Sequence, residues 1–324
     1  MRRAIIAGTG SYVPEYRMTN AAMAELVETS DEWIASRTGI RERRISTGEN
    51  TSDLAYEAAY RALQSAAVDA KELDLIICAT ITPDSFMPSV ACMVQERLGA
   101  RKAAAFDLAA ACSGLIYGMA CAAAFIEAGM YQKILVVGAE TLSKTLDWTD
   151  RSTCVLFGDG AGAVLLSASD ANKGISTVHL LSDGSKKDYL SLPALPLYNP
   201  MISKKDDLTR TITMKGQEVF KFAVRSITEH IHTILQKADT SEDDIKYIVT
   251  HQANYRIIEQ AAKSSKIPIE RFYMNLDLYG NTSAASIGIA LDEMVQKGML
   301  TAGDKLLLIG FGGGMTSGAI LVEW

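Results

Sequence analysis

Aromatic residues are scarce in this 324-residue chain, at 7% of the sequence, whereas alanine and glycine are abundant. A core with few large rings favours helices and strands that approach one another closely. The five cysteines form no CxxC pair and no disulfide framework, so we expect reduced thiols in a cytoplasmic protein. The net charge of -6 provides no general basic surface, which argues against nucleic-acid binding.

Motifs for bound cofactors are also missing. The run Gly310-Phe311-Gly312-Gly313-Gly314 has no following Lys-Ser or Lys-Thr, and Gly8-Thr9-Gly10-Ser11 lacks the third glycine of a dinucleotide fingerprint. No spacing of His, Cys and carboxylates fits a metal site, and no apolar stretch approaches the length of a membrane span. We therefore expect no metal, no cofactor and no membrane contact, and we interpret the glycine runs as tight turns.

Short β-branched runs alternate with longer helical patterns along the chain. Strands are predicted at 3–7, 75–80, 134–139, 161–167, 247–250, 306–309 and 319–323. Helices are predicted at 51–66, 88–98, 113–128, 216–237, 255–264 and 284–297. Continuous apolar strands that alternate with helices are typical of a sheet buried on both faces, so the fold class is α/β.

The two halves of the sequence resemble each other. Three patterns recur in the same order: a helix that leads into an apolar strand, a small-residue helix, and a glycine turn that leads into a strand. The matched segments are 51–77 with 216–249, the helix after residue 112 with 283–288, and 158–166 with 312–322. This order predicts an internal duplication, with one α/β half at 1–170 and the other at 171–324. Gly114 and Gly118, one helical turn apart, would let the paired central helices approach closely.

One stretch, 182–210, fits neither half. It carries Pro193, Pro196, Pro200 and a charged run at 204–207. A loop of this length is either functional or an insertion, and the sequence leaves both interpretations open.

Cys112 lies in Asp107-Leu-Ala-Ala-Ala-Cys112-Ser113-Gly114, directly before an apolar helix. A thiol at a helix N-terminus lies near the positive end of the dipole, which stabilises a thiolate nucleophile. Its backbone N–H can also face the oxyanion of an attached acyl group. The alternative is a small buried residue among alanines, as free cysteines often are.

His251 follows a predicted strand, and Asn281 precedes the second small-residue helix. Polar residues at the carboxyl ends of strands are where α/β folds place their sites, and an Asn beside a His can donate to a carbonyl oxygen that gains charge. The duplication places Asn281 and Cys112 at related helix starts that face one pocket. The alternatives are a structural histidine and an ordinary helix N-cap.

Six segments together resemble β-ketoacyl-acyl-carrier-protein synthase III, a family of the thiolase-like superfamily. The resemblance covers nearly the whole chain in order. The segments are Asp31-Glu32-Trp33-Ile34 with residues 37–43, Ala111-Cys112-Ser113-Gly114, residues 157–163, His251-Gln252-Ala253-Asn254, Gly280-Asn281-Thr282-Ser283-Ala284-Ala285, and Gly312-Gly313-Gly314.

The resemblance implies a duplicated five-layered α-β-α-β-α fold, a homodimer and a Cys-His-Asn triad of Cys112, His251 and Asn281. In the first implied stage, Cys112 takes an acyl group from acyl-coenzyme A, and the N–H groups of Cys112 and Gly313 hold the oxyanion. In the second stage, His251 and Asn281 donate hydrogen bonds to the thioester carbonyl of malonyl-acyl carrier protein as carbon dioxide leaves. The product is a β-ketoacyl thioester that starts fatty acid synthesis, with acetyl-coenzyme A as the expected primer.

The same resemblance assigns binding residues. Trp33 stacks on the adenine of coenzyme A, and Thr29, Arg37 and Arg151 lie at the nucleotide end. Basic docking positions for the acidic carrier protein fall at Lys221, Arg256 and Lys263, although an ordinary solvated charged face is an equal alternative. Met87 stands where many acetyl-specific members carry Phe to close the partner's acyl pocket, so longer or branched primers are expected to fit.

Three other functions compete with this interpretation. A specialised relative would transfer the acyl group from Cys112 to an alcohol, an amine or another non-malonyl acceptor. A carrier-protein-binding scaffold would need no nucleophile, and the intact triad argues against it. A nucleotide-dependent oxidoreductase lacks a complete fingerprint.

Overall fold

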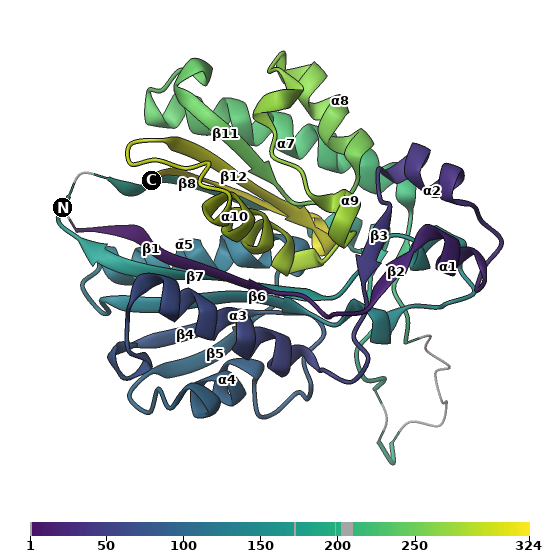
Figure 1. Ribbon diagram of the computed structural model, residues 1–324, viewed down its shortest axis with the longest axis horizontal. Helices are drawn as coiled ribbons and strands as arrows, with labels where there is room; N and C mark the ends of the chain where they lie inside the picture. Colours follow the sequence, from purple (N-terminus) through teal and green to yellow (C-terminus); the bar gives the residue numbers. More distant parts are fainter. Residues whose placement is uncertain (1, 172, 198, 202–209) are drawn as a thin grey trace.

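Two stacked β-sheets organise the computed structural model, which describes residues 2–171, 173–197, 199–201 and 210–324 (Figure 1). The first sheet has five strands in the order β1-β7-β6-β4-β5, and the second has four in the order β11-β12-β13-β8. The strands of the first sheet are β1 (Arg3–Tyr12), β4 (Leu75–Ala79), β5 (Ala104–Leu108), β6 (Lys133–Glu140) and β7 (Gly160–Ser169). Those of the second are β8 (Gly174–Ser182), β11 (Ile245–Thr250), β12 (Lys305–Gly312) and β13 (Thr316–Glu323).

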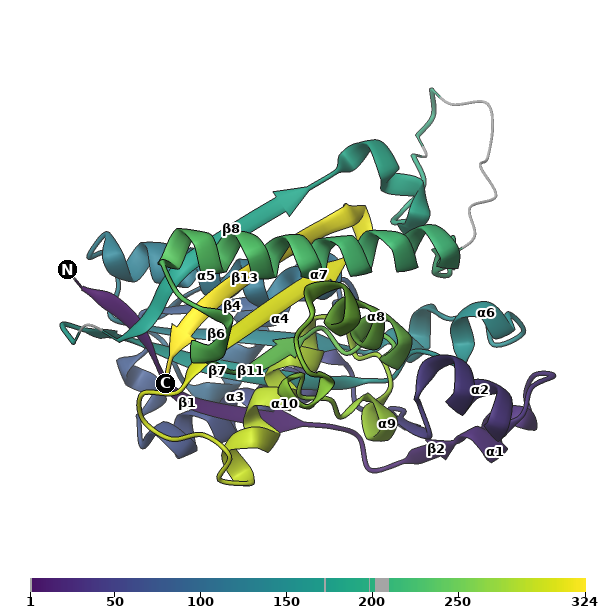
Figure 2. The same cartoon turned by 90° about the horizontal axis from the view of Figure 1, so that it is seen from above.

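Helices form three layers around and between these sheets (Figures 1 and 2). Helices α3 (Thr51–Ala66) and α4 (Val90–Leu98) cover the outer face of the first sheet. Helices α5 (Gly114–Glu127) and α10 (Ser286–Gln296) lie between the two sheets, and α7 (Gly216–Ala238) covers the outer face of the second, with α8 (Tyr255–Ser265) packed on α7. The predicted five-layered α-β-α-β-α fold is confirmed.

Both sheets repeat one pattern of strand directions. In the first sheet β1 and β7 are antiparallel, β7 and β6 are antiparallel, and β6 and β4 are parallel. In the second sheet β8, β13, β12 and β11 pair in the same three ways, in the same order. Every strand of the first sheet precedes residue 170 and every strand of the second follows residue 171, which supports the proposal of two duplicated halves.

Smaller elements gather mainly at the end of the molecule opposite the two termini (Figure 1). The helices are α1 (Asn20–Ala24), α2 (Asp31–Thr38), α6 (Arg151–Cys154) and α9 (Leu276–Tyr279). Two short two-stranded sheets pair β2 (Arg17–Thr19) with β3 (Glu42–Arg44), and β9 (Leu190–Ser191) with β10 (Thr213–Met214). Eight short 3-10 turns complete the connections within the described residues. They are η1 (Ala70–Glu72), η2 (Ala111–Ser113), η3 (Leu142–Thr145), η4 (Gly184–Tyr189), η5 (Glu242–Asp244), η6 (Ile269–Arg271), η7 (Ser283–Ala285) and η8 (Gly313–Met315). Within 182–210, the turn η4 leads directly into strand β9, and residues 198 and 202–209 lie outside the described part of the chain.

The glycines of the central layer contact strands more than the neighbouring helix. A Cβ on Gly118 would lie 2.7 Å from Val136 Cγ1 on β6, so the prediction that Gly118 brings the two central helices together is wrong. A Cβ on Gly114 would lie 2.8 Å from the Ala79 Cβ on β4 and 3.4 Å from the Ala284 Cβ. Gly162 of β7 packs closely against Gly288 of α10, where an added Cβ would lie 2.5 Å from the opposite backbone.

Within the described ranges, no helix is both long enough and apolar enough to cross a membrane.

Candidate active site

Cys112 lies in η2, in the connection that leads from β5 into α5. Ala111 adopts a left-handed φ of 46°, which turns the chain sharply before the nucleophile. In the second half Ser283 adopts a φ of 49° before Ala284, so Ala284 occupies the position that corresponds to Cys112. The related helix starts are therefore present, and Asn281 stands three residues ahead of the residue that matches Cys112.

The Cys112 side chain is almost fully buried, with 6% of the residue exposed. Burial raises the pKa of the thiol to about 12, and a hydrogen bond with the Ser283 side chain opposes part of that rise. The helix start was expected to stabilise the thiolate, but desolvation outweighs it here. The resting group is therefore the neutral thiol, and its proton must leave before the sulfur attacks.

His251 follows the last residue of β11, as the sequence predicted, and only 1% of it is exposed. Its Nδ1 lies 2.7 Å from the Ser286 hydroxyl on α10, and its ring meets Phe311 edge-on at 5.1 Å between centroids. Burial lowers the pKa of the imidazole to about 3, so the ring is neutral. Since Ser286 occupies Nδ1, Nε2 is the ring nitrogen left for a ligand.

Asn281 is fixed through its backbone and its side chain together. Its N–H donates to the Leu156 carbonyl and its carbonyl accepts from the Gly158 N–H, each at 2.9 Å. Its Oδ1 accepts from the Ser283 N–H at 2.9 Å, which leaves the Nδ2 group as the free donor of the carboxamide. The helix α10 begins only at Ser286, so Asn281 is not its N-cap.

Cys112, His251 and Asn281 line one cavity of about 150 Å³. The three residues come from η2, from the end of β11 and from the stretch before η7, and only the stacking of the two halves brings them together. The cavity is also lined by Val219 and Phe220 of α7, by Asn254 at the N-cap of α8 and by Ile257 of α8.

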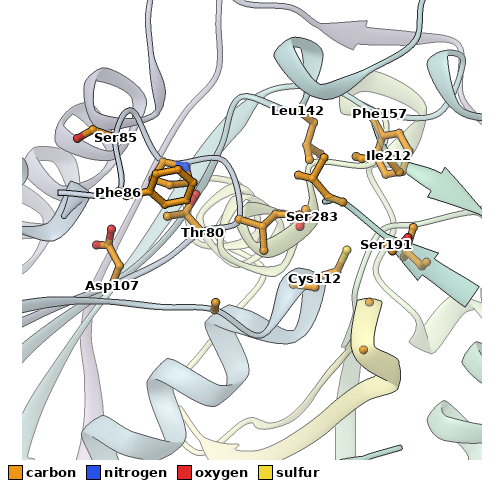
Figure 3. Close-up of a pocket in the computed structure, with 18 residues that line it drawn as sticks. Thr80, Ser85, Phe86, Asp107, Cys112, Leu142, Phe157, Ser191, Ile212 and Ser283 are labelled. Atoms are coloured by element: carbon orange, nitrogen blue, oxygen red, sulfur yellow. The ribbon is translucent and has the colours of Figure 1, made fainter. Parts of the chain in front are cut away.

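A second and larger cavity, of about 460 Å³, meets the first at Cys112 (Figure 3). Cys112, Phe157 and Leu190 line both cavities, so the sulfur lies at their junction. The second cavity is mostly apolar, and Leu142, Phe157 and Ile212 lie along one end of it while Phe86 and Ser85 lie at the other. A chain attached to Cys112 can therefore extend into apolar space while a second ligand approaches past His251 and Asn281.

The C-terminal glycine run closes one side of the nucleophile. A Cβ on Gly312 would lie 2.6 Å from the Cys112 backbone nitrogen, so only glycine allows this approach. Gly313 follows at the start of η8 and lines the larger cavity beside Cys112. The predicted pair of oxyanion residues, Cys112 and Gly313, is therefore brought together.

The residues assigned to coenzyme A gather around α2. The Arg37 and Arg151 guanidinium groups lie 4.8 Å and 4.7 Å from the centroid of the Trp33 ring. Arg151 also donates to the Glu28 carbonyl at 2.8 Å, next to Thr29, whose buried Oγ1 has no partner among the described residues. Asn254 connects this cluster to the smaller cavity, because its Nδ2 donates to the Arg37 carbonyl at 3.1 Å.

The predicted docking lysines are exposed on the outer helices of the second half. Lys221 on α7 pairs with Glu218 at 3.0 Å, and Lys263 on α8 pairs with Glu259 at 3.1 Å, so each charge is partly neutralised. Arg256 is exposed in the first turn of α8. Lys221 and Arg225 line a surface groove together with Phe220, which also lines the smaller cavity beside the triad.

Met87 lines neither of these two cavities, and 85% of the residue is exposed. Its neighbour Phe86, 70% exposed, lines the larger cavity instead.

Sequence reasoning missed Phe86 as a cavity residue, and also Ser286, Ser283 and Glu140, which contact the triad or its neighbours. For Glu140 a signal existed, since it is a charged residue at the carboxyl end of an apolar strand. Among the described residues, no three His, Cys, Asp or Glu side chains gather in a way that holds a metal ion.

Comparisons with known proteins agree on one family. A family model described as 3-oxoacyl-[acyl-carrier-protein] synthase III matches residues 106–184, and the model of the C-terminal part of that enzyme matches residues 235–324. A β-ketoacyl-[acyl-carrier-protein] synthase III from Clostridium beijerinckii is 54% identical over 319 residues, 98% of each chain. The crystal structure of the synthase III from Aquifex aeolicus is 44% identical, with a TM-score of 0.93 over 99% of this chain and 100% of that chain. The Pseudomonas aeruginosa synthase III structure is 40% identical, with a TM-score of 0.92 over 99% of this chain and 98% of that chain.

Proposed function

Because the chain belongs to the β-ketoacyl-acyl-carrier-protein synthase III family, an acyltransferase class of condensing enzymes, we propose how its residues divide the reaction. Cys112 accepts the acyl group of an acyl-coenzyme A, and His251 with Asn281 then promotes decarboxylation of malonyl-acyl carrier protein. The single observation that carries this assignment is the position of the Cys112 sulfur, at the junction of an apolar cavity and the cavity that holds His251 and Asn281.

In the first stage the Cys112 sulfur attacks the thioester carbonyl of the primer. The backbone N–H groups of Cys112 and Gly313 stabilise the oxyanion, and coenzyme A leaves. The primer tail extends into the larger cavity, where Leu142, Phe157 and Ile212 offer apolar walls. Acetyl-coenzyme A is the proposed primer, and the cavity volume of about 460 Å³ supports the proposal that longer or branched chains also fit.

In the second stage the malonyl thioester occupies the smaller cavity. The Nε2–H of His251 and the Nδ2–H of Asn281 donate to its carbonyl oxygen as carbon dioxide leaves, which stabilises the enolate. Both donors are fixed in advance, His251 by Ser286 and Asn281 by Ser283 and the Leu156–Gly158 backbone. The carbanion attacks the acyl group on Cys112 and releases the β-ketoacyl product. No bound cofactor takes part, since both thioesters are substrates.

The two substrates approach from the same end. Trp33 is proposed to stack on adenine, with Thr29, Arg37 and Arg151 at the nucleotide end. Lys221, Arg256 and Lys263 are proposed to dock the acidic carrier protein, a proposal supported by the groove that Phe220 shares with the smaller cavity. The cytosol is the proposed compartment, and the five unpaired cysteines support it.

We also propose that the enzyme is a homodimer, joined along β5. This strand is the edge of the first sheet, and Phe106 on it is 37% exposed. Phe86 and Met87 extend the apolar surface beside it, and no segment within the described ranges covers them. An unpaired edge strand beside exposed large apolar side chains favours pairing with a second copy, which would place Met87 at the partner's acyl cavity.

Incubation with acetyl-coenzyme A followed by intact-mass measurement tests the first stage. The wild-type chain is expected to gain one acetyl group, and Cys112→Ser is expected to gain none. Malonyl-acyl carrier protein is then added to the acetylated enzyme, and release of carbon dioxide with loss of the adduct supports condensation. An adduct that persists with malonyl-acyl carrier protein but transfers to an alcohol or amine would instead support the non-malonyl alternative. No adduct on Cys112 would contradict the proposal and favour a carrier-protein-binding scaffold.

A further inference from the structure

A buried carboxylate joins the two halves of the molecule next to the triad. Glu140, the last residue of β6, has no exposed surface. From the first half it accepts hydrogen bonds from the Thr82 hydroxyl at 2.6 Å and from the Thr80 hydroxyl and the Ile81 N–H at 3.1 Å. From the second half it accepts one from the Ser283 hydroxyl at 3.1 Å. A buried carboxylate needs such donors, and because they come from both halves, Glu140 fixes the connection after β4 relative to η7.

Ser283 connects this carboxylate to the Asn281 side chain. Its hydroxyl donates to Glu140 Oε1, and its backbone N–H donates to Asn281 Oδ1 at 2.9 Å. The two backbone hydrogen bonds of Asn281 hold its main chain but leave its side-chain torsions free. The bond from the Ser283 N–H therefore decides which end of the Asn281 carboxamide is left for a ligand in the smaller cavity, namely the Nδ2 group. Any movement of Ser283 would turn this donor.

The first half shows that the turn at Ser283 does not need the hydroxyl. Ala111, directly before Cys112, has a φ of 46°, and Ser283, directly before Ala284, has a φ of 49°. Since Ala111 has no hydroxyl, this left-handed turn forms without a side-chain hydrogen bond. The second half carries a hydroxyl at the corresponding position and binds it to Glu140. The added bond therefore serves to hold in place the residue whose N–H orients Asn281.

We infer that Glu140 is a positioning residue for the decarboxylation stage, because it anchors Ser283 and thereby holds the Asn281 carboxamide with its Nδ2 group toward the smaller cavity. Glu140 forms and breaks no covalent bond, and Asn281 remains the group that donates to the malonyl carbonyl. Ser283 also lines the larger cavity (Figure 3), but attack of Cys112 on the primer uses no donor from Asn281. The effect of Glu140 is therefore expected in condensation and not in acylation. The inference rests on the proposed role of Asn281.

Single-turnover kinetics on the acetylated enzyme test this inference. The enzyme is first acetylated with acetyl-coenzyme A, and carbon dioxide release is then timed after malonyl-acyl carrier protein is added. Glu140→Ala and Ser283→Ala are each expected to slow this release about tenfold, the effect of losing roughly one hydrogen bond, and to acylate at the wild-type rate. Glu140→Gln keeps an acceptor oxygen for Ser283 and is expected to stay within about twofold of wild type. Ser283→Gly, which adopts the left-handed φ without strain, replaces Ser283→Ala if that variant does not fold.

A double-mutant cycle with Asn281→Ala shows whether Glu140 acts through Asn281. Asn281→Ala alone is expected to slow condensation about a hundredfold, the effect of losing one donor to the developing charge. Adding Glu140→Ala or Ser283→Ala to it is expected to slow condensation no further, because the carboxamide that these residues orient is already absent. A second loss of the same size as in the single variants would show a general distortion and overturn the inference.

Asp292→Ala is the matched control for the loss of a buried carboxylate. Asp292 on α10 is also buried, and it accepts from the Thr9 hydroxyl at 2.9 Å and the Ser11 hydroxyl at 2.7 Å. Asp292→Ala is expected to condense at the wild-type rate even if its melting temperature falls. The inference is overturned if Glu140→Ala condenses at the wild-type rate, or if Glu140→Gln or Asp292→Ala is as slow as Glu140→Ala. Wild-type condensation by Asn281→Ala would instead overturn the proposed role of Asn281.

Discussion

The Ser286 hydroxyl lies 2.7 Å from Nδ1 of His251 and, at 3.4 Å, also accepts a hydrogen bond from the Gln252 N–H. With the oxygen already accepting, its own hydrogen is available for Nδ1. We therefore assign the imidazole proton to Nε2, on the side of the cavity that Asn281 also lines. A neutral ring with its hydrogen on Nε2 is the form that can donate to the malonyl carbonyl.

Ser286→Ala is therefore expected to slow condensation about tenfold, the effect of losing roughly one hydrogen bond, while acylation of Cys112 stays unchanged. Single-turnover rates of the two stages, measured separately, check this. Ser265→Ala is the control, because the buried Ser265 hydroxyl on α8 has no partner within the described residues. Equal slowing of both stages in Ser286→Ala would show a general structural effect instead.

Trp33→Ala is expected to raise the KM for acyl-coenzyme A about fivefold, because the lost stacking on adenine is worth about 1 kcal/mol. The ring also contacts Arg37 and Arg151, whose guanidinium groups lie against it. The KM for malonyl-acyl carrier protein is expected to change little. Steady-state kinetics with each substrate varied in turn measure both values. Tyr60→Ala, which removes an exposed aromatic ring on the far outer layer, is expected to leave both constants unchanged.

Met87→Phe is expected to narrow the primer range toward acetyl. Met87 is exposed in the single chain, and the proposed dimer places it at the partner's acyl cavity, where a rigid ring would leave less room than a flexible thioether. Competition between acetyl-, butyryl- and isobutyryl-coenzyme A measures the preference. Met130→Phe makes the same change at another exposed methionine and is expected to have no effect. A wild-type enzyme that already strongly prefers acetyl would remove the basis for this prediction.

Reversing the charge of Lys221 tests the docking surface. Lys221→Glu is expected to weaken binding of malonyl-acyl carrier protein several-fold at low ionic strength and less at high salt, because exposed charges are screened. Acylation by acyl-coenzyme A is expected to be unaffected. Lys71→Glu changes the net charge equally, in η1 beside the first sheet, and serves as the control. Equal weakening by both substitutions would show that overall charge, and not the groove on α7, attracts the carrier protein.

The raised pKa of Glu140 also predicts how stability depends on pH. The carboxyl has a pKa of 4.5 in the unfolded chain and of about 7 in the folded protein. Between these pH values the folded carboxyl holds a proton that the unfolded chain has released, so the free energy of unfolding falls as the pH rises. A shift of this size corresponds to roughly 3 kcal/mol. Glu140→Gln removes this term, so its stability relative to wild type is expected to be more favourable at pH 8 than at pH 5. Denaturant unfolding of both proteins at the two pH values measures the difference, and a constant difference would contradict the prediction.

Sequence patterns located most of the regular elements, and the failures have physical causes. Helix α3 was predicted at its exact bounds, because its apolar face and its Asn50 cap are both local features. Strand β5 was missed because it is short and alanine-rich, with weak intrinsic preference for a strand. Strand β8 was missed because its mixed composition becomes a strand only by pairing with β13. Strand β1 was predicted at 3–7, but it extends through Gly8 and Gly10 to Tyr12. Glycine is needed there because a Cβ on Gly10 would lie 2.3 Å from the α3 backbone.

By itself the sequence determined the α/β class, and it predicted the duplication and the triad of Cys112, His251 and Asn281, because periodicity and motifs are local properties of the chain. Only the tertiary structure decided what surrounds them. The junction of two cavities at Cys112, the contact of Ser286 with His251 and the hydrogen bond from Ser283 to Glu140 all join residues far apart in the chain. Burial in this packed centre also decides which groups carry protons, since desolvation depends on neighbours from both halves.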